Sequence, residues 1–237
     1  MLLFDAHLHV FSKEPDIPDD GFFCINAAEP AHWPLVAACA AEHDTVRGFA
    51  GVHPCFTGTV YRSWDTDLEA LLIDNPDLGV GEIGLDARKQ YTAVLPEQEA
   101  LLSRQLGLAA KHKRPVSLHC VRAYGRLIPI LREHLPEFGT AIRGIVHWFA
   151  GGDAQMKALL EMGLHISFHP TIHTADPGRK ALLRRCPPER LLLETDSETG
   201  PDIATLKEHY SKTAVWLGMP VEKLQQQVMH NGTLCTN

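Results

Sequence analysis

Apolar and polar residues alternate at the start of the chain. In "FDAHLHV" (residues 4–10) every second residue is apolar, and the residues between are Asp5, His7 and His9. Because successive side chains of a β-strand point to opposite faces, this pattern predicts a strand with three polar side chains on one face. Such a face either meets solvent or binds a ligand.

Seven further short apolar runs follow, and most alternate with stretches whose apolar residues recur at helical spacing. The predicted strands cover residues 2–10, 21–27, 46–54, 78–86, 114–120, 143–149, 164–170 and 190–197. The predicted helices cover residues 32–44, 68–75, 96–113, 123–135, 153–163, 178–186 and the part from Ile203 onward. Strands that alternate with helices are typical of a parallel sheet covered by helices.

Eight such strands in 237 residues predict an α/β protein with a TIM-like (β/α)8 barrel, in a single domain that covers residues 1–237. A doubly wound open sheet is the alternative, but no glycine-rich phosphate-binding motif opens a helix. Between the first two strands lies only "FSKEPDIPDD" (residues 11–20), with two prolines and four acidic residues. Because proline disrupts a helix and aspartate disfavours one, we expect this crossover helix to be missing or reduced to a turn.

Composition narrows the functional classes. The formal net charge is −7, and the chain has no run of lysine and arginine of the kind that binds long nucleic acids. A nuclease that holds phosphates through metal ions is still compatible with this charge. The six cysteines are scattered without a C-x-x-C pair, which predicts reduced thiols. With neither a signal-peptide pattern nor a membrane-spanning apolar run, we expect a cytoplasmic protein that needs no membrane and no obligate protein partner.

Polar side chains end all of the predicted strands. In chain order they are His7 and His9, Asn26, His53, Glu82 and Asp86, His119, His147, His169, and Asp196. Active sites of barrels lie at the carboxyl ends of the strands, so we expect these side chains to converge.

A divalent-metal site is the best interpretation of this set. Taken singly, a histidine at a strand end is more often a hydrogen-bonded structural residue, and an aspartate after a strand often caps the next helix. Taken together, imidazole nitrogens and carboxylate oxygens at one end of a barrel are typical of divalent-metal ligands. Cysteine is absent from most of these positions, which disfavours a structural zinc cluster.

Five segments carry a resemblance to a known family. They are "DAHLH" (5–9), "GEIGLD" (81–86), "LHC" (118–120), "VHWFAG" (146–151) and "LLLETDS" (191–197). In this order they resemble the motifs of the TatD family of metal-dependent hydrolases, which includes the TatD-related deoxyribonucleases and belongs with the amidohydrolase-like barrels.

The resemblance implies a centre with two divalent metal ions. One ion would bind His7, His9 and Asp196, the other would bind His119 and His147, and Glu82 would bridge both. Mixed nitrogen and oxygen ligands favour zinc or manganese, and magnesium is the alternative because the family is known to use it.

The implied reaction is hydrolysis of phosphodiester bonds, with DNA or a small phosphodiester as the substrate. The two ions would activate a water molecule. Glu82 and Asp196 would be catalytic, with Asp196 orienting the water and accepting its proton. Hydrolysis of small carboxyl esters, lactones or amides is the alternative, favoured by the acidic charge. A binding protein with a decayed site is disfavoured because all six ligand positions are filled.

Five further residues are expected to contact the substrate or to support the ligands: Asn26, His53, Asp86, Arg122 and His169. Asp86 and Asn26 are candidates for fixing the tautomers of the ligating histidines, and Arg122 is a candidate phosphate contact. Asp5 lies on the same face of the first strand as the two histidines but one step deeper, so we expect it to be buried and hydrogen-bonded.

Two departures from the family pattern concern the substrate side of the barrel. His169 and His173 stand where the family seldom has histidine, and Glu198 stands where it usually has proline. The two histidines are candidates for extra phosphate contacts or for ligands of a third metal, with hydrogen-bonded loop residues as the alternative.

Overall fold

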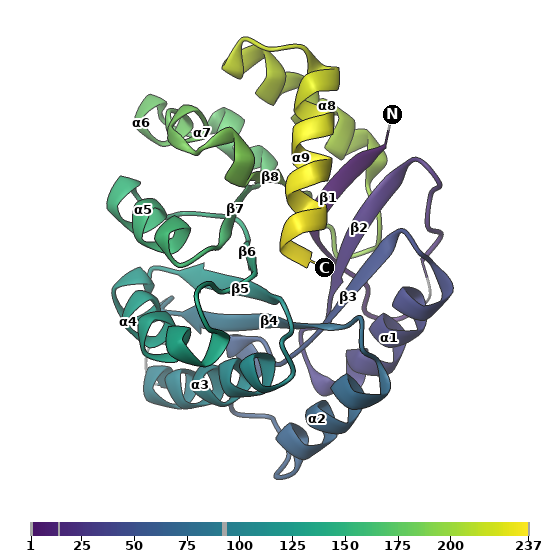
Figure 1. Cartoon of the computed structure of the whole chain (residues 1–237), viewed down its shortest axis with the longest axis vertical. Coiled ribbons are helices and arrows are strands. Elements are labelled where there is room, and N and C mark those ends of the chain that lie inside the picture. Colours follow the sequence, from purple (N-terminus) through teal and green to yellow (C-terminus); the bar gives the residue numbers. More distant parts are fainter. Residues whose placement is uncertain (1, 14, 92–93, 237) are drawn as a thin grey trace.

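A nearly closed barrel of parallel strands forms the centre of the protein. The computed structural model describes residues 2–13, 15–91 and 94–236, and in these residues eight strands pair in chain order (Figure 1). The strands are β1 (Leu3–His9), β2 (Gly21–Asn26), β3 (Val46–Ala50), β4 (Gly79–Asp86), β5 (Val116–Val121), β6 (Gly144–Val146), β7 (His165–Phe168) and β8 (Leu191–Leu193). The prediction of a (β/α)8 barrel is confirmed.

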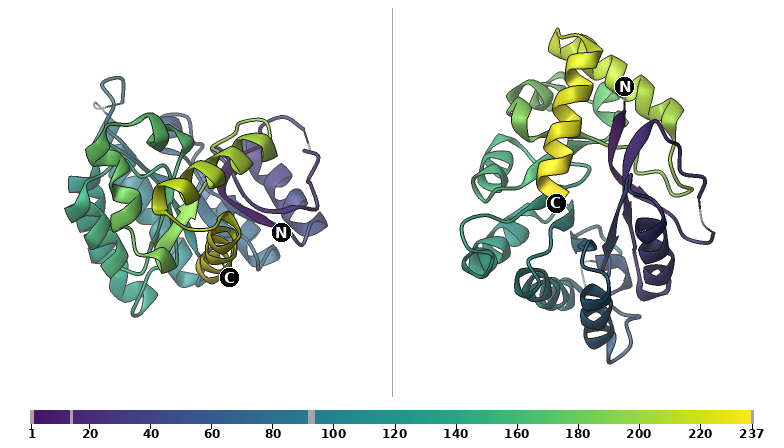
Figure 2. Two further views of the ribbon diagram at one scale, coloured as in Figure 1. Left: turned by 90° about the horizontal axis from the view of Figure 1, so that it is seen from above. Right: turned by 45° about the vertical axis from the view of Figure 1, so that its right-hand side comes forward.

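Helices surround the barrel (Figures 1 and 2). They are α1 (Trp33–Glu42), α2 (Trp64–Asp74), α3 (Leu95–Lys111), α4 (Tyr124–His134), α5 (Asp153–Glu161), α6 (Pro177–Lys180), α7 (Leu182–Arg185), α8 (Ile203–Leu217) and α9 (Val221–Thr236). Short 3-10 helices are η1 (Pro30–His32), η2 (Pro54–Phe56), η4 (Leu135–Phe138), η5 (Pro170–Thr174) and η6 (Pro188–Arg190). The predicted helix 178–186 is thus two short helices. None of the helices described is long and apolar enough to cross a lipid bilayer.

The connection between β1 and β2 contains no helix in its described residues, 10–13 and 15–20. The expectation drawn from its prolines and acidic residues is confirmed. The chain here runs as an extended loop beside the barrel (Figure 2).

The barrel closes between β1 and the loop that follows β8. The amide of Asp196 donates to the carbonyl of His7 over 2.9 Å, and the amide of His9 donates to the carbonyl of Ser197 over 2.7 Å. Asp5 is buried beneath this seam, and its carboxylate accepts hydrogen bonds from the amide and hydroxyl of Thr195 at 2.9 and 2.6 Å. The seam places the side chain of Asp196 beside the two histidines of β1.

The C-terminal helices α8 and α9 contact the two strands, β1 and β8, that lie at this seam. The hydroxyl of Tyr210 on α8 donates to the carbonyl of Phe4 over 2.8 Å. On α9, Asn231 donates to the carbonyls of Pro188 and Leu191 at 2.7 and 2.9 Å, which holds the start of β8. Both helices therefore support the two strands that meet at the seam.

The predicted strands extend too far at their carboxyl ends. Strands β6, β7 and β8 end at Val146, Phe168 and Leu193, so His147, His169 and Asp196 lie in the loops that follow. Asp196 follows the end of β8 and has a φ of 51°, in the left-handed region, where the backbone changes direction. Apolar runs alone do not indicate this turn of the backbone.

Gly84, in the "GEIGLD" segment of β4, has no room for a side chain. Its φ is 150°, and an added Cβ would lie 1.9 Å from the carbonyl oxygen of His119 on β5. We expect Gly84→Ala to lower the free energy of unfolding by more than about 4 kcal/mol, because backbone strain and overpacking combine. Urea denaturation measures this. Gly107→Ala is the matched control, since a Cβ there meets no atom within 4 Å and should leave stability unchanged or slightly raised. Equal stabilities of the two variants would contradict the prediction.

Candidate active site

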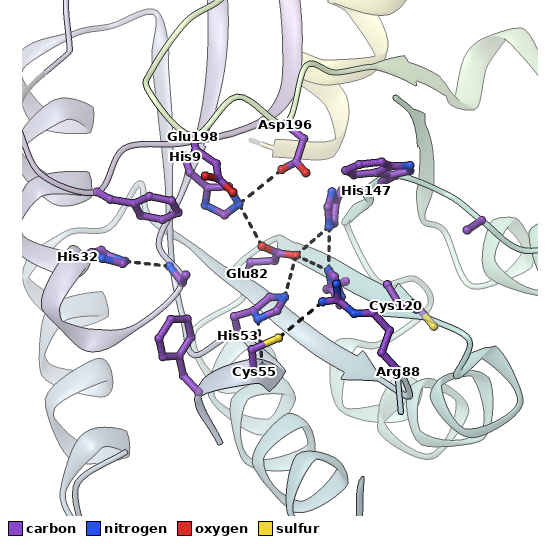
Figure 3. A pocket seen from close by; sticks show the side chains of 17 residues that line it. His9, His32, His53, Cys55, Glu82, Arg88, Cys120, His147, Asp196 and Glu198 are labelled. Atoms are coloured by element: carbon purple, nitrogen blue, oxygen red, sulfur yellow. Dashed lines mark hydrogen bonds and ion pairs between the residues drawn. The ribbon is translucent and has the colours of Figure 1, made fainter. Parts of the chain in front are cut away.

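A cavity of about 780 Å³ lies at the carboxyl ends of the strands (Figure 3). Its wall includes His9, His53, Glu82, His119, His147 and Asp196 from six different strands or the loops after them. His7 lies beneath this wall and is fully buried. The structure therefore brings together all six residues that the resemblance assigns to metal binding.

Glu82 lies at the centre of the group, and its two oxygens face different sets of histidines (Figure 3). Oε2 is 3.5 Å from Nε2 of His7 and 3.3 Å from Nε2 of His9. Oε1 is 2.7 Å from both Nδ1 of His119 and Nε2 of His147. Glu82 is thus the one carboxylate in the group that reaches both pairs of ligands.

Asp196 completes the side of the group nearest the seam. Its Oδ1 is 3.6 Å from Nε2 of His7 and 3.5 Å from Nε2 of His9. Its side chain is 18% exposed, against 3% for Glu82, so it is the carboxylate of the group that meets the cavity most openly.

Contacts on the far side of three imidazole rings indicate which nitrogen carries the proton when each ring is neutral. Nδ1 of His9 lies 2.8 Å from the main-chain carbonyl of Asn26, which can only accept, so Nδ1 carries the proton. Nε2 of His119 faces the carboxylate of Asp86 at 3.4 Å, and Nδ1 of His147 faces that of Glu194 at 3.5 Å. The opposite nitrogens of these neutral rings then present lone pairs to the centre.

These lone pairs converge on one another and on a carboxylate. Nδ1 of His119 and Nε2 of His147 are 3.1 Å apart, and both lie close to Oε1 of Glu82, which accepts no hydrogen bond of normal geometry among the described residues. The Nε2 atoms of His7 and His9 are likewise 3.1 Å apart. Acceptors that face acceptors repel unless a cation lies between them, and mixed imidazole and carboxylate ligands suit divalent cations. The arrangement therefore fits divalent-metal binding.

Without a cation, protons would take the place of the metal. Although burial alone lowers it, the pKa of His147 is raised well above its usual value by the negative charges of Glu82 and Glu194. The pKa values of His9 and His119 are also raised, against the effect of burial, chiefly by Glu82. Burial raises the pKa of Glu82 itself, but the surrounding histidines hold it well below the usual range.

A family model described as "TatD related DNase" matches residues 4–235, nearly the whole chain. The chain belongs to this family. Two relatives carry the name 3'-5' ssDNA/RNA exonuclease TatD. The protein from Edwardsiella piscicida is 39% identical over 150 residues, which are 62% of this chain and 56% of that protein. The protein from Pantoea ananatis is 32% identical over 208 residues, 81% of this chain and 78% of that protein.

Solved structures of the family share the fold. A TatD homologue from Escherichia coli superposes with a TM-score of 0.82 at 24% identity, covering 98% of this chain and 97% of that chain. A TatD family hydrolase from Entamoeba histolytica gives a TM-score of 0.77 at 17% identity, covering 90% and 83% of the two chains. At these identities the likeness concerns the barrel and not the substrate.

Three of the expected supporting residues lie near the histidines and Glu82 of this TatD-related site. The contacts that they make were only partly expected from the sequence. Asp86 faces His119 as expected, and its carboxylate also accepts from Nε of Arg88 over 2.7 Å. Asn26 contacts His9 through its main-chain carbonyl, while its side-chain amide donates to the carbonyl of Cys24. His53 comes closer than a supporting residue would need to, with Nε2 at 3.7 Å from Oε1 of Glu82.

The other expected contacts of the substrate lie farther out. Arg122 is exposed and does not line the cavity, whereas Arg88 does. His169 stacks on Trp148, and Nε2 of His173 lies 2.8 Å from Nδ1 of His209 on α8. Neither histidine belongs to the groups that could hold a metal ion. Glu198 does line the cavity.

Glu194 is a buried residue of the site that the sequence analysis missed. It is part of the "LLLETDS" segment, and a charged residue between a buried strand and Asp196 was the available signal. Its Oε1 faces Nδ1 of His147 and also accepts the amide of Trp148 over 2.6 Å. Ser117 has the corresponding place for His7, with Oγ at 3.2 Å from Nδ1.

We expect Glu194→Gln to weaken metal affinity or activity by about 10- to 100-fold, because the imidazole of His147 loses the carboxylate that orients it. Titration with zinc or manganese, followed by calorimetry, measures the affinity. Glu133→Gln on the exposed face of α4 is the control and should bind metal like the unmodified chain. If both variants bind metal with the same affinity, Glu194 does not orient His147.

Proposed function

We propose that this chain is a metal-dependent phosphodiesterase that removes nucleotides from single-stranded DNA or RNA. The observation that carries the proposal is the convergence of imidazole nitrogens on Glu82 in a TatD-related barrel. The substrate class is that of the two relatives, which are named 3'-5' ssDNA/RNA exonucleases. The six free cysteines fit a reducing compartment such as the cytoplasm.

Six side chains would hold two divalent ions. His7, His9 and Asp196 would hold the first and His119 and His147 the second, and Glu82, which lies between the two sets, would contribute to both. The position of His53 supports it as a further ligand or neighbour of the second ion. Zinc or manganese suits the histidine-rich ligand set better than magnesium does.

When bound, such ions lower the pKa of a water molecule and neutralise charge on the phosphoryl group. Asp196 would orient the attacking water and take its proton. Burial raises the pKa of Asp196 to about 6, opposed by the positive charge of His147 and reinforced by Glu82. A carboxylate with this pKa is ionised at neutral pH, as binding of a divalent ion requires.

Arg88 is the cationic side chain in the cavity wall, and its guanidinium is held in place by Asp86. We propose that it contacts a phosphate of the substrate, in the role expected for Arg122. A single arginine agrees with the acidic net charge: phosphate recognition would rest on the metal ions and on one guanidinium rather than on a basic surface.

The test is cleavage of a 5'-labelled single-stranded oligonucleotide by the chain supplied with zinc, manganese or magnesium, analysed as a ladder over time. Stepwise shortening from the 3' end is the expected result, and the same oligonucleotide in a blunt duplex should be cut more slowly. A panel of carboxyl esters, lactones and amides is assayed beside it. Turnover of those compounds alone would overturn the nuclease proposal in favour of the ester and amide hydrolase alternative.

A further inference from the structure

Trp148 is a large apolar side chain that the proposed metal chemistry does not use. It follows His147 directly, lines the cavity and is 40% exposed, although the histidine beside it is buried. Leaving an indole ring in water is unfavourable. Because it lies in the wall of the cavity beside His147, a molecule that fills the cavity can cover it.

The indole is held in a fixed position. The main chain of Trp148 has a φ of 38°, which is uncommon for a bulky residue, and its amide donates to Oε1 of Glu194. One face of the indole is covered by the imidazole of His169, with the ring centres 3.7 Å apart and the planes at 16°. A ring with one face packed and fixed loses little conformational entropy on binding.

The stack also gives a physical reason for the position of His169. It lies after β7, and its Nδ1 accepts the amide of Thr171 over 3.2 Å. Its ring is thus oriented by η5 and supports the indole. Because burial lowers its pKa, the neutral imidazole is favoured in this stack.

We propose that Trp148 is the stacking surface for a nucleobase, namely the base of the nucleotide whose phosphodiester bond is cut. This inference rests on the proposed function and deepens it. Stacking on an aromatic side chain tolerates any base, since every base has a π-face. It also requires an unpaired base, because a base inside a duplex is already stacked between its neighbours. Trp148 would therefore select single strands and prefer purines, which stack more strongly.

The first test compares two oligonucleotides, one with an adenine at the 3'-terminal nucleotide and one with an abasic residue there. The unmodified chain is expected to cleave the adenine substrate with a kcat/KM about tenfold or more above that for the abasic substrate. Trp148→Ala should lower the value for adenine to the abasic level and change the abasic value less than about twofold. Trp148→Phe should be intermediate. Trp216→Ala, which removes an indole packed against Lys180 and Arg184, is the matched control.

The second test measures binding without turnover. An oligonucleotide with cleavage-resistant phosphorothioate linkages is added to the metal-supplied chain while tryptophan fluorescence is recorded. A terminal adenine should quench the emission, and the quenching should be lost in Trp148→Phe and retained in Trp216→Phe. Equal loss of kcat/KM for both substrates in Trp148→Ala, or quenching that persists in Trp148→Phe, would overturn the proposal. If the unmodified chain cleaves neither substrate with any metal, the proposed nuclease function fails, and the quenching experiment alone decides the stacking role.

Discussion

Glu82→Gln is expected to abolish hydrolysis, lowering kcat/KM by more than about 1,000-fold, and to reduce the bound metal below one ion per chain. Glu82 is buried and places one oxygen near His7 and His9 and the other near His119 and His147. The glutamine has the same shape but no negative charge, and its amide group points donors at one set of ligands. One proposed ion therefore loses a ligand atom, and both lose the negative charge of Glu82.

Metal content by elemental analysis and oligonucleotide cleavage check this result, with circular dichroism to verify the fold. Glu133→Gln on α4 serves again as the control and should keep its metal and its activity. The prediction is wrong if Glu82→Gln retains two ions per chain and cleaves at the rate of the control. Retention of metal with loss of cleavage would show instead that the charge of Glu82 acts on the reaction.

Removal of metal is expected to destabilise the protein increasingly as the pH rises above about 6.5. In the metal-free site the pKa values of His9, His119 and His147 are raised above the usual 6.5. The stability that these protonated histidines contribute is fully present below the unfolded pKa and is lost as the pH rises through the folded values. Metal binding has the opposite dependence, because it requires the unprotonated rings.

The two other histidines near Glu82 do not reverse this loss of stability with rising pH. Burial lowers the pKa of His7 and of His53 to about 3, so both are neutral in the folded state throughout this pH range. In the unfolded state both lose their protons around pH 6.5, so above about pH 7.5 they add no pH dependence to the stability. Each proton that the metal must displace adds up to about 1.4 kcal/mol of metal-dependent stabilisation per pH unit. The stabilities of the metal-loaded and metal-free protein should therefore diverge.

Thermal unfolding with excess chelator and with excess zinc or manganese, repeated across this pH range, measures the difference in Tm. In Glu82→Gln the metal-free protein should lose much of its pH dependence, because the charge that raises these histidine pKa values is gone. A difference in Tm that stays constant or narrows with rising pH would contradict the protonation scheme.

Three of the histidines around Glu82 are contacted by different parts of the chain. The main chain of β2 supports His9, Asp86 at the end of β4 supports His119, and Glu194 after β8 supports His147. Glu194 also accepts the amide of Trp148, so one carboxylate connects the orientation of a metal ligand with the proposed stacking surface. This coupling explains why the effects of substitutions at Glu194 and Trp148 should not be independent.

The sequence by itself determined the barrel and the kind of site that it carries. Alternation in "FDAHLHV" and seven further apolar runs predicted the strands, because period and burial are local properties of a chain. Prolines and acidic residues at 11–20 excluded the first crossover helix for the same reason. The residue types at the strand ends, with the family motifs, indicated all six residues that meet around Glu82.

Only the tertiary structure decided what surrounds these six residues. Glu194 reaches His147 across 47 positions of sequence and Ser117 reaches His7 across 110, and hydrophobic pattern carries no information on such pairs. The exposure of Arg122, the placement of Arg88 in the cavity and the stacking of Trp148 on His169 depend on how loops turn after short strands. Arg122, Trp148 and Asp196 have left-handed backbone conformations at these turns, and such a conformation changes the direction of the side chains that follow. It is stabilised by partners from other strands rather than by neighbours in sequence.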